Sequence, residues 1–359
     1  MKKIDKNLLL MILFSIAFGF VAGILGFISL GSGAFTLPFL GSVEFSDTDL
    51  DRQIVIDQPR NVVVDQDLQL KQIENDLLPT LVNVYLNKTS QQLLNKAYLD
   101  TEQLGHGFVL TADGWIVTTD QVVKNLNGKY VVFGYQNKKY EMDNLILDEA
   151  TGLVFGKAEA QSLPVSKIGR SNELFVGQTL VLASDRDKLD IVHISKIGYE
   201  YDLPQAIVQS SDELSKQLWL DIDLKEYDGS VLTNLKGEIV GVVNNSQIIL
   251  VDYFRNIIGQ VLDNQKIERA SLNIDYIDLS QVEGLLEYGD KGALVYTVPA
   301  KSPAYGKLKK DDVIKKVDDI EINSYQSLSE LINTYKKGNS IELLVARGNQ
   351  EITLDITLD

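Results

Sequence analysis

The stretch that most restricts the fold is residues 69–269, where short runs of Val, Ile, Leu, Tyr and Phe alternate with turns of Gly, Asn and Asp. Such runs predict strands, because branched and aromatic side chains fit a pleated, half-buried surface. The candidate strands are residues 81–86, 107–111, 115–118, 129–134, 145–148, 152–157, 179–183, 190–197, 218–222, 238–243 and 248–251. Many short strands at close spacing indicate an all-β barrel or sandwich. A closing helix is predicted from apolar residues at helical spacing, namely Phe254, Ile257, Ile258, Val261 and Leu262.

Residues 8–30 form an almost unbroken apolar run without a charge. At about 1.5 Å per residue, a helix of this length crosses a hydrocarbon core of about 30 Å, so one N-terminal transmembrane helix is predicted. Lys2, Lys3 and Lys6 precede it, and the positive-inside rule then places residues 1–7 in the cytoplasm and the main domains outside. A cleaved signal peptide is the alternative, but the run exceeds the usual h-region of about 7–15 residues.

Composition and charge limit the possible functions. The chain has 50 acidic and 34 basic side chains in 359 residues, a formal charge of −16, which argues against a nucleic-acid partner because phosphate binding requires clustered Lys and Arg. It has no cysteine, and its two histidines are His106 and His193, so thiolate and histidine chemistry are tightly limited. We expect no cofactor and no metal ion. Residues 31–68, acidic and without clear periodicity, are predicted to be an extracytoplasmic linker.

Several stretches match one protein family in the same order. Residues 105–118 read Gly-His-Gly-Phe-Val-Leu-Thr-Ala-Asp-Gly-Trp-Ile-Val-Thr. This stretch is similar to the motif Gly-Ser-Gly-Phe-Ile-x-x-x-Asp-Gly-Tyr-Ile-x-Thr of HtrA/Deg trypsin-like serine proteases. Residues 169–178 resemble the Gly-x-Ser-x-x-Leu-x-Val-Gly-Asp of that family, and residues 234–241 resemble its Asn-x-x-Gly-Glu-Val-Ile-Gly. The resemblance implies a mainly β fold, with a chymotrypsin/trypsin-like double β-barrel over residues 69–269.

The last segment, residues 270–359, resembles an α+β PDZ domain of the HtrA type. The matching stretches are Gly-Ala-Leu-Val at residues 292–295, Ser-Pro-Ala at 302–304 and Leu-Lys-Lys-Asp-Asp-Val-Ile at 308–314. Ser327 and Glu330 have the spacing of a capping box for its long helix. The apolar face of that helix is predicted to comprise Leu328, Leu331, Ile332 and Tyr335. Residues 341–347 and 351–358 are predicted to form a hairpin around Gly348-Asn349.

PDZ domains bind an extended peptide as an added strand and capture its C-terminal carboxylate with backbone N–H groups. The resemblance places this carboxylate loop at Ser271, Leu272, Asn273 and Ile274. Asn273 stands where the family has a flexible glycine, and Asn tolerates left-handed backbone angles better than most residues. We therefore expect carboxylate capture, with a PDZ domain that merely packs against the barrel as the alternative.

A serine protease needs a hydroxyl nucleophile, a histidine base, an orienting carboxylate and backbone N–H groups for the oxyanion. The resemblance places the histidine of the family at Gln121, its aspartate at Gly152 and its serine at Asp228. Gln121 has no useful basic nitrogen, Gly152 has no side chain, and the Asp228 carboxylate repels an oxyanion. Glu226 and Tyr227 replace the Gly-Asn that precedes the nucleophile. The sequence therefore predicts a pseudoprotease with no catalytic residues, which is not an enzyme.

Other residues offer alternatives to this interpretation. Ser230 could be a shifted nucleophile or an ordinary turn serine, and His106 could be a relocated base or a loop histidine. His193, on a predicted strand, is expected to be structural. Asp221, Asp223, Glu226 and Asp228 could form a cation site, although such spacing is usual for a solvated acidic loop.

The leading hypothesis is a single-pass, membrane-anchored, extracytoplasmic HtrA-like pseudoprotease that binds proteins or peptides. It would act as a scaffold, adaptor or regulator in envelope protein quality control, and its partners would be polypeptide C-termini or envelope proteins. One rival is an active serine-type endopeptidase with a rearranged site. Another is a chaperone or regulatory subunit of an active HtrA protease. The resemblance allows a homotrimer or a hetero-assembly with such a relative.

Overall fold

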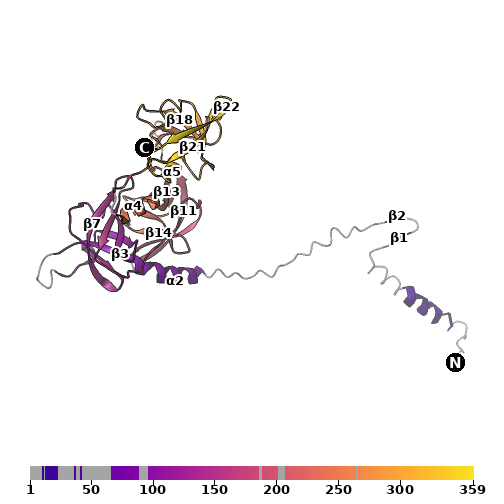
Figure 1. Cartoon of the computed structure of the whole chain (residues 1–359). Helices are drawn as coiled ribbons and strands as arrows, with labels where there is room; N and C mark the ends of the chain where they lie inside the picture. Colours follow the sequence, from indigo (N-terminus) through magenta and orange to yellow (C-terminus); the bar gives the residue numbers. More distant parts are fainter. Residues whose placement is uncertain are drawn as a thin grey trace. The chain divides into compact units, whose positions relative to one another are not determined.

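The computed structural model describes residues 10–11, 13–22, 36–37, 41–42, 66–88, 96–185, 188–200, 207–263 and 266–359. The chain divides into two compact units, residues 1–64 and 65–359 (Figure 1). In the first unit, residues 13–22 are helical, and β1 (Thr36–Leu37) pairs antiparallel with β2 (Gly41–Ser42). No helix among the described residues is long and apolar enough to cross a membrane. The transmembrane helix predicted over residues 8–30 is therefore not found, and residues 8–9, 12 and 23–30 of that prediction lie outside the described residues.

The second unit begins with helix α2 (Gln66–Leu77), which the sequence analysis did not anticipate. Its apolar residues Leu70, Ile73 and Leu77 recur at helical spacing, and Ile73 and Leu77 are buried in the core. The short 3₁₀ turn η1 (Leu78–Thr80) follows, and Pro79 in this turn cannot continue an α-helix because it lacks an N–H donor. Helix α2 thus begins within residues 31–68, the range expected to be a linker.

Six strands close the first β-barrel in the order β3-β4-β5-β8-β7-β6. Their bounds are β3 (Leu81–Leu86), β4 (Gly105–Val109), β5 (Trp115–Thr119), β6 (Tyr130–Gly134), β7 (Lys138–Asp148) and β8 (Leu153–Ala158). Two short 3₁₀ turns, η2 (Asp100–Glu102) and η3 (Tyr135–Asn137), lie between strands. Branched and aromatic residues alternate along the strands, and the barrel interior is filled by Val82, Val84, Ile116, Val132 and Val154.

The second β-structure is a sheet in the order β13-β11-β10-β14-β15-β16, and its end strands β13 and β16 lie against each other. Its strands are β10 (Thr179–Asp185), β11 (Lys188–Gly198), β13 (Gln217–Leu220), β14 (Val231–Thr233), β15 (Glu238–Asn244) and β16 (Gln247–Leu250). The short strand β9 (Lys167–Ile168) pairs parallel with β15. The predicted closing helix is present in three pieces, η5 (Val251–Tyr253), η6 (Arg255–Ile257) and α4 (Ile258–Leu262). Phe108, Phe155, Val181 and Phe254 belong to one buried cluster, so both β-structures share a core.

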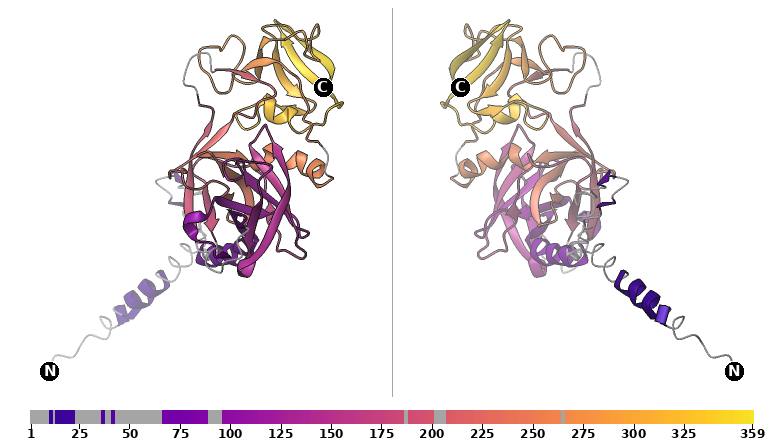
Figure 2. Two further views of the ribbon diagram at one scale, coloured as in Figure 1. Left: turned by 90° about the vertical axis from the view of Figure 1, so that its left-hand side faces the viewer. Right: turned by 90° about the vertical axis from the view of Figure 1, so that its right-hand side faces the viewer.

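Figure 2 shows the C-terminal domain, coloured mainly orange to yellow. Its sheet has the order β12-β17-β18-β19-β21-β22, and β20 pairs with β19. The strands are β12 (Val208–Ser210), β17 (Asp275–Asp278), β18 (Ala293–Thr297), β19 (Val313–Val317), β20 (Ile320–Glu321), β21 (Ser340–Arg347) and β22 (Gln350–Thr357). Helix α5 (Leu328–Ile332) is shorter than expected, but its capping box between Ser327 and Glu330 is formed. The hairpin around Gly348-Asn349 is present as predicted. β12 comes from a loop of the preceding β-structure and was not predicted.

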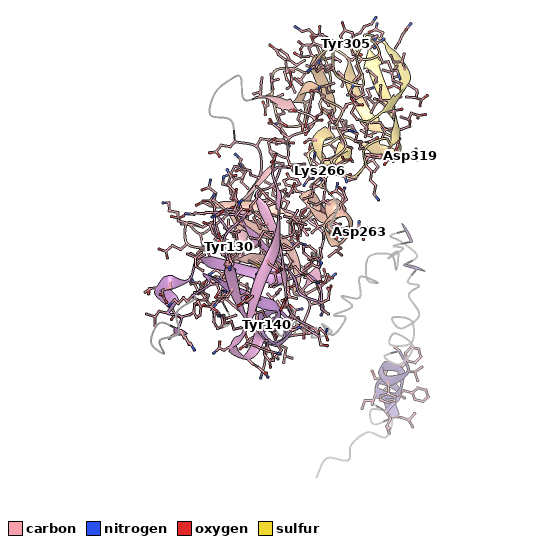
Figure 3. The ribbon with its side chains drawn as sticks, turned by 60° about the vertical axis from the view of Figure 1, so that its left-hand side comes forward. Tyr130, Tyr140, Asp263, Lys266, Tyr305 and Asp319 are labelled. Carbon is pink, nitrogen blue, oxygen red and sulfur yellow. The ribbon has the colours of Figure 1, made fainter. Side chains whose placement is uncertain are left out.

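Arg269 connects the segment before the C-terminal domain to the first barrel. Its guanidinium pairs with Asp148 Oδ2 at 2.5 Å and donates to Tyr253 O at 2.8 Å. Figure 3 labels Asp263 and Lys266 in this connecting segment, Tyr130 and Tyr140 in the first barrel, and Tyr305 and Asp319 in the C-terminal domain. Because Asp148 is 2% exposed, the ion pair is an internal part of the structure and not a surface contact.

Candidate functional site

The positions that the family resemblance assigned to the triad surround one turn of the second β-structure. Gln121 follows β5, Gly152 lies between β7 and β8, and Asp228 lies just before β14. A Cβ atom on Gly152 would lie 2.5 Å from Asn244 Nδ2, and the next residue, Asn245, donates its N–H to Asp228 Oδ1 at 2.7 Å. The Asn244–Asn245 turn therefore brings Gly152 and Asp228 together.

A carboxylate next to Gln121 completes this site. The Asp120 N–H donates to Gly152 O at 2.8 Å, and Gln121 Nε2 donates to Asp120 Oδ1 at 3.3 Å. A Cβ atom on Gly152 would lie 3.1 Å from Asp120 Oδ2. The side chain of Gln121 thus interacts with its neighbour, and Asp120 points toward the space beside Gly152. The sequence analysis did not single out Asp120, Asn244 or Asn245.

The electrostatics at Asp228 favour a proton or a cationic group over an anion. Burial raises the pKa of the Asp228 carboxyl, the Asn245 N–H opposes this rise, and the negative charge of Asp120 adds to it. A neighbouring negative charge makes ionisation of the Asp228 carboxyl less favourable. Neither carboxylate supplies the N–H donors that would stabilise a developing oxyanion.

The turn at residues 228–230 packs directly on strand β4. Gly229 has φ of +81°, and a Cβ atom there would lie 1.8 Å from His106 O, so this position requires glycine. The His106 N–H donates to Asp228 O at 3.1 Å, and Thr118 Oγ1 donates to His106 O at 2.7 Å. Backbone contacts therefore fix His106 beside the turn.

The His106 ring and the Ser230 hydroxyl are the groups of the rearranged-site alternative. Burial lowers the pKa of His106 to about 4, so the imidazole is neutral near pH 7. Its Nδ1 lies 3.0 Å from Gln103 Nε2 and 3.3 Å from Asn83 Oδ1. Ser230 is 1% exposed. Among the described residues, its Oγ has no hydrogen-bond partner, and His106 does not bind it.

The acids proposed as a cation site interact with their own neighbours. Asp221 accepts the His193 N–H at 2.8 Å and lies 2.9 Å from His193 Nδ1, and these hydrogen bonds lower the pKa of the Asp221 carboxyl. Asp223 pairs with Lys225 at 3.2 Å on the surface. The described part of the chain contains no group of three or more His, Cys, Asp or Glu residues that could hold a metal ion. Asp221 and Asp223 thus lie in a solvated acidic loop.

The carboxylate loop at residues 271–274 has a carboxylate bound to it, and this carboxylate belongs to Asp212 of the same chain. The N–H groups of Leu272 and Asn273 both donate to Asp212 Oδ1 at 3.0 Å, and Ser271 Oγ donates to the other carboxylate oxygen. Asn273 has φ of +49°, the left-handed conformation that the sequence analysis expected asparagine to tolerate. Leu272 and Ile274 are buried and hold the loop in the domain core.

The residues before Asp212 continue this interaction as a strand. Ser211 exchanges hydrogen bonds with Ile274, as its N–H donates to Ile274 O at 2.9 Å and its Oγ accepts from the Ile274 N–H at 3.1 Å. β12 then pairs antiparallel with β17, with Val208 opposite Ile277 and Ser210 opposite Asp275. Sequence reasoning missed this segment because one acidic residue in a polar loop carries no signal for a contact some sixty residues away.

A cavity of about 370 Å³ lies between the second β-structure and the C-terminal domain. Its lining includes Leu174, Phe175 and Val176 on one side and Tyr325 and Glu330 on the other. Phe175 and Val176 are 58% and 59% exposed, so the cavity opens onto an apolar surface. Extended polypeptide with apolar side chains suits such a surface better than a small polar ligand does.

Comparison with known proteins finds similarities to both parts of the chain. A model of the PDZ domain family matches residues 263–358. Two curated relatives are named probable periplasmic serine endoprotease DegP-like, one from Hahella chejuensis at 26% identity over 284 residues and one from Pseudomonas savastanoi pv. phaseolicola at 27% over 288 residues. Each alignment covers 72% of this chain, which spans just over half of each relative, 57% and 56%.

Solved structures agree on the fold. HtrA-type protease AlgW with a tripeptide superposes with a TM-score of 0.55 at 17% identity, over 80% of this chain and 96% of that one. HtrA-type protease AlgW with a decapeptide gives a TM-score of 0.52 at 17% identity, over 80% and 97% of the two chains. At this identity the likeness establishes the fold, a mainly β protease-type domain followed by a PDZ domain.

The relatives correct one prediction from the sequence. The expectation that this chain is not an enzyme is wrong, because the relatives that match most of its length are named serine endoproteases. That expectation rested on three positions, Gln121, Gly152 and Asp228, whereas the similarity to the relative from Hahella chejuensis extends over 284 aligned residues.

Proposed function

Because the chain belongs to the HtrA/DegP-like, trypsin-like proteases that carry a PDZ domain, we propose that it works outside the cytoplasm by binding exposed polypeptides. The observation that carries this proposal is the loop at residues 271–274, which presents its N–H groups to a carboxylate. A free polypeptide C-terminus presents the same chemical group at the end of an extended strand. The protein then acts as a scaffold, adaptor or regulator for the polypeptides it holds.

An extracytoplasmic location is supported by the relatives, which are named periplasmic. We propose that the charge-free run at residues 8–30 attaches the protein to the membrane, with Lys2, Lys3 and Lys6 on the cytoplasmic side. Apolar side chains on helical residues 13–22 support this proposal, since Phe14, Phe18 and Phe20 are 69%, 78% and 71% exposed. Carbonate extraction of membranes from cells that make the full chain tests it, and release of the protein into the soluble fraction would reject attachment.

Binding is tested with the full chain in detergent and a library of labelled decapeptides in two forms, one with a free C-terminal carboxylate and one with a C-terminal amide. We expect the free-acid form to bind and the amide form to bind at least about tenfold more weakly, because charge-assisted hydrogen bonds exceed neutral ones by about 1 kcal/mol or more. Equal binding of both forms, or no binding of either, would reject capture of C-termini.

The second candidate function is endopeptidase activity with a rearranged site, favoured by the names of the relatives and by the position of His106 beside the 228–230 turn. Proteolysis of this type needs a nucleophile and a base, and the groups of these kinds near the turn are Ser230 and His106. Cleavage of casein by the full chain, lost in both Ser230→Ala and His106→Asn but retained in His193→Asn, would support it. Absence of cleavage, or cleavage that both variants retain, would reject this site.

A further inference from the structure

The edge of the C-terminal domain where a peptide would bind is covered by the chain itself. β12 lies antiparallel along β17, and the chain direction of β12 leads toward the loop at residues 271–274. A bound peptide in this mode would also run antiparallel to the strand and end at the carboxylate loop. Residues 208–212, which we call the internal ligand, therefore have the direction and pairing of a bound peptide.

The end of the internal ligand carries the group that the loop recognises. Ser211 is the last residue whose backbone N–H pairs with the domain, at Ile274 O, and the next residue supplies a carboxylate. That carboxylate, on Asp212, accepts from three donors of the loop, which are Ser271 Oγ and the N–H groups of Leu272 and Asn273, and also from Ser211 Oγ at 2.9 Å. A peptide that ended at the position of Ser211 would place its own α-carboxylate near the same donors.

The contacts of the internal ligand with the domain are weak enough for another peptide to replace it. Asp212 is exposed, so water competes for its carboxylate, and β12 is three residues long and pairs with a single strand in the described sheet. Apolar anchoring is partial, because Ile207 and Val208 are half-buried against Ile277 and Leu294. Such a short segment opens at a lower free energy than the strands of a core.

We propose that residues 208–212 occupy the PDZ groove as an internal ligand, and that a polypeptide C-terminus must displace them in order to bind. This inference rests on the proposed function, since it concerns the same groove, and it adds a class of ligand. The preferred partner is an extended chain end with small polar residues at its last positions, because Ser210 and Ser211 fill these positions now. The free carboxylate of such a chain end replaces the Asp212 side chain.

Displacement also has an effect on the second β-structure. Four residues after Asp212, Lys216 binds Glu330 and Tyr325 O, and the next residue begins β13. Lys216 and Leu218 line the cavity described above. Release of the internal ligand would therefore loosen the approach to β13.

The first test compares the full chain with its Asp212→Asn variant and with Glu213→Gln as a matched control that changes the neighbouring exposed acid. The probe is a labelled peptide of residues 205–211, Gln-Ala-Ile-Val-Gln-Ser-Ser, with a free C-terminal carboxylate. We expect Asp212→Asn to bind the probe about tenfold or more tightly than the natural chain, because a weaker competitor leaves more of the groove open. Glu213→Gln should bind it as the natural chain does.

The second test locks the internal ligand in place. The chain has no cysteine, so a Ser210→Cys/Asp275→Cys variant contains one possible disulfide, between residues directly opposite in register. We expect the oxidised form not to bind the probe and the reduced form to bind it, with the disulfide verified by mass. Failure of the disulfide to form, or equal binding in both redox states, would overturn the proposal.

The outcomes separate this inference from the proposed function. If the natural chain binds the free-acid probe as tightly as Asp212→Asn does, the internal ligand is not a competitor, and capture of C-termini stands. If neither Asp212→Asn nor the reduced lock variant binds the probe, both the internal ligand and the capture of C-termini are rejected.

Discussion

Lys216 Nζ lies 3.3 Å from Glu330 Oε2, so a residue just before β13 is paired with the first turn of helix α5. The same Nζ donates to Tyr325 O at 2.6 Å, and the Ser327 N–H donates to Glu330 Oε2 at 2.9 Å. The Lys216 side chain is 6% exposed. One carboxylate thus serves both the helix cap and the contact between two domains.

Replacement of Lys216 by Met should reduce the free energy of unfolding by about 2 kcal/mol. The reason is that Glu330 loses its cation in a region that is largely shielded from water, although less completely than in a fully buried pair, for which the loss is about 3–5 kcal/mol. Urea unfolding followed by tryptophan fluorescence measures this. The control is Lys225→Met, whose pair with Asp223 is exposed and should cost less than about 0.5 kcal/mol. Equal losses in the two variants would contradict this account.

Acidification should destabilise the fold through His106. Its pKa is about 4 in the folded chain, against about 6.5 in an unfolded one, so the unfolded state binds a proton first. The contribution is fully present above pH 6.5 and is lost as the pH falls toward 4. Between pH 8 and pH 4.5 the loss amounts to about 2–3 kcal/mol.

The measurement is the free energy of unfolding in urea at these two pH values for the natural chain and for His106→Asn. Asparagine does not titrate, so the variant should lose less stability over this interval. The same pH dependence in both proteins would show that His106 is not held neutral by burial.

Gly229→Ala should be strongly destabilising because the new Cβ atom would lie 1.8 Å from His106 O. The backbone on one side must shift, and the left-handed φ of +81° adds strain, for a total of about 3 kcal/mol or more. Gly177 has a similar φ of +85° with nothing within 4 Å, so Gly177→Ala should cost about 1 kcal/mol from φ strain. Thermal unfolding of both variants gives the comparison, and similar Tm values would exclude the close contact at Gly229.

Arg269→Met should cost about 3–5 kcal/mol, the usual loss when one partner of a buried ion pair is removed. Asp148 is 2% exposed and would remain without its cation. Arg255→Met is the control, because the Arg255 side chain is 39% exposed and its pair with Asp252 should contribute about 1 kcal/mol or less. Chemical denaturation measures both losses. Equal losses at Arg269 and Arg255 would contradict this account.

The sequence predicted most strands of the two β-structures, because alternation of branched and polar residues is a local signal, but of the 11-residue strand β7 it predicted only residues 145–148. The expected strands at residues 81–86 and 115–118 agree with β3 and with all but the last residue of β5. The strands β9 and β12 have two or three residues and exist through pairing with distant partners, so no local pattern predicts them. Helix α2 was missed because its exposed face is highly polar and its apolar residues are few.

Family motifs gave candidate site positions along the chain, at Gln121, Gly152, Asp228 and residues 271–274, and the roles of these residues stay predictions. The residues that surround these positions could not be predicted, because their contacts join parts of the chain that are distant in the sequence. The contact between Asp212 and Leu272 joins residues 60 apart, and it depends on a loop that leaves one domain to pair with another. The enzyme prediction was wrong for a related reason, since it rested on three side chains and not on the whole relationship.

β12 gives the C-terminal domain an unusual order of assembly. Its sheet is not encoded in one continuous stretch, because residues 208–210 are synthesised well before the strand they join at residues 275–278. A fragment that begins at residue 266 would therefore fold with β17 as an outer strand, whose backbone N–H and C=O groups lack the partners that β12 provides. Unpaired outer strands are templates for other chains. Isolation of this domain by truncation would thus create a polypeptide that self-associates. In the intact chain, β12 covers β17 and prevents this.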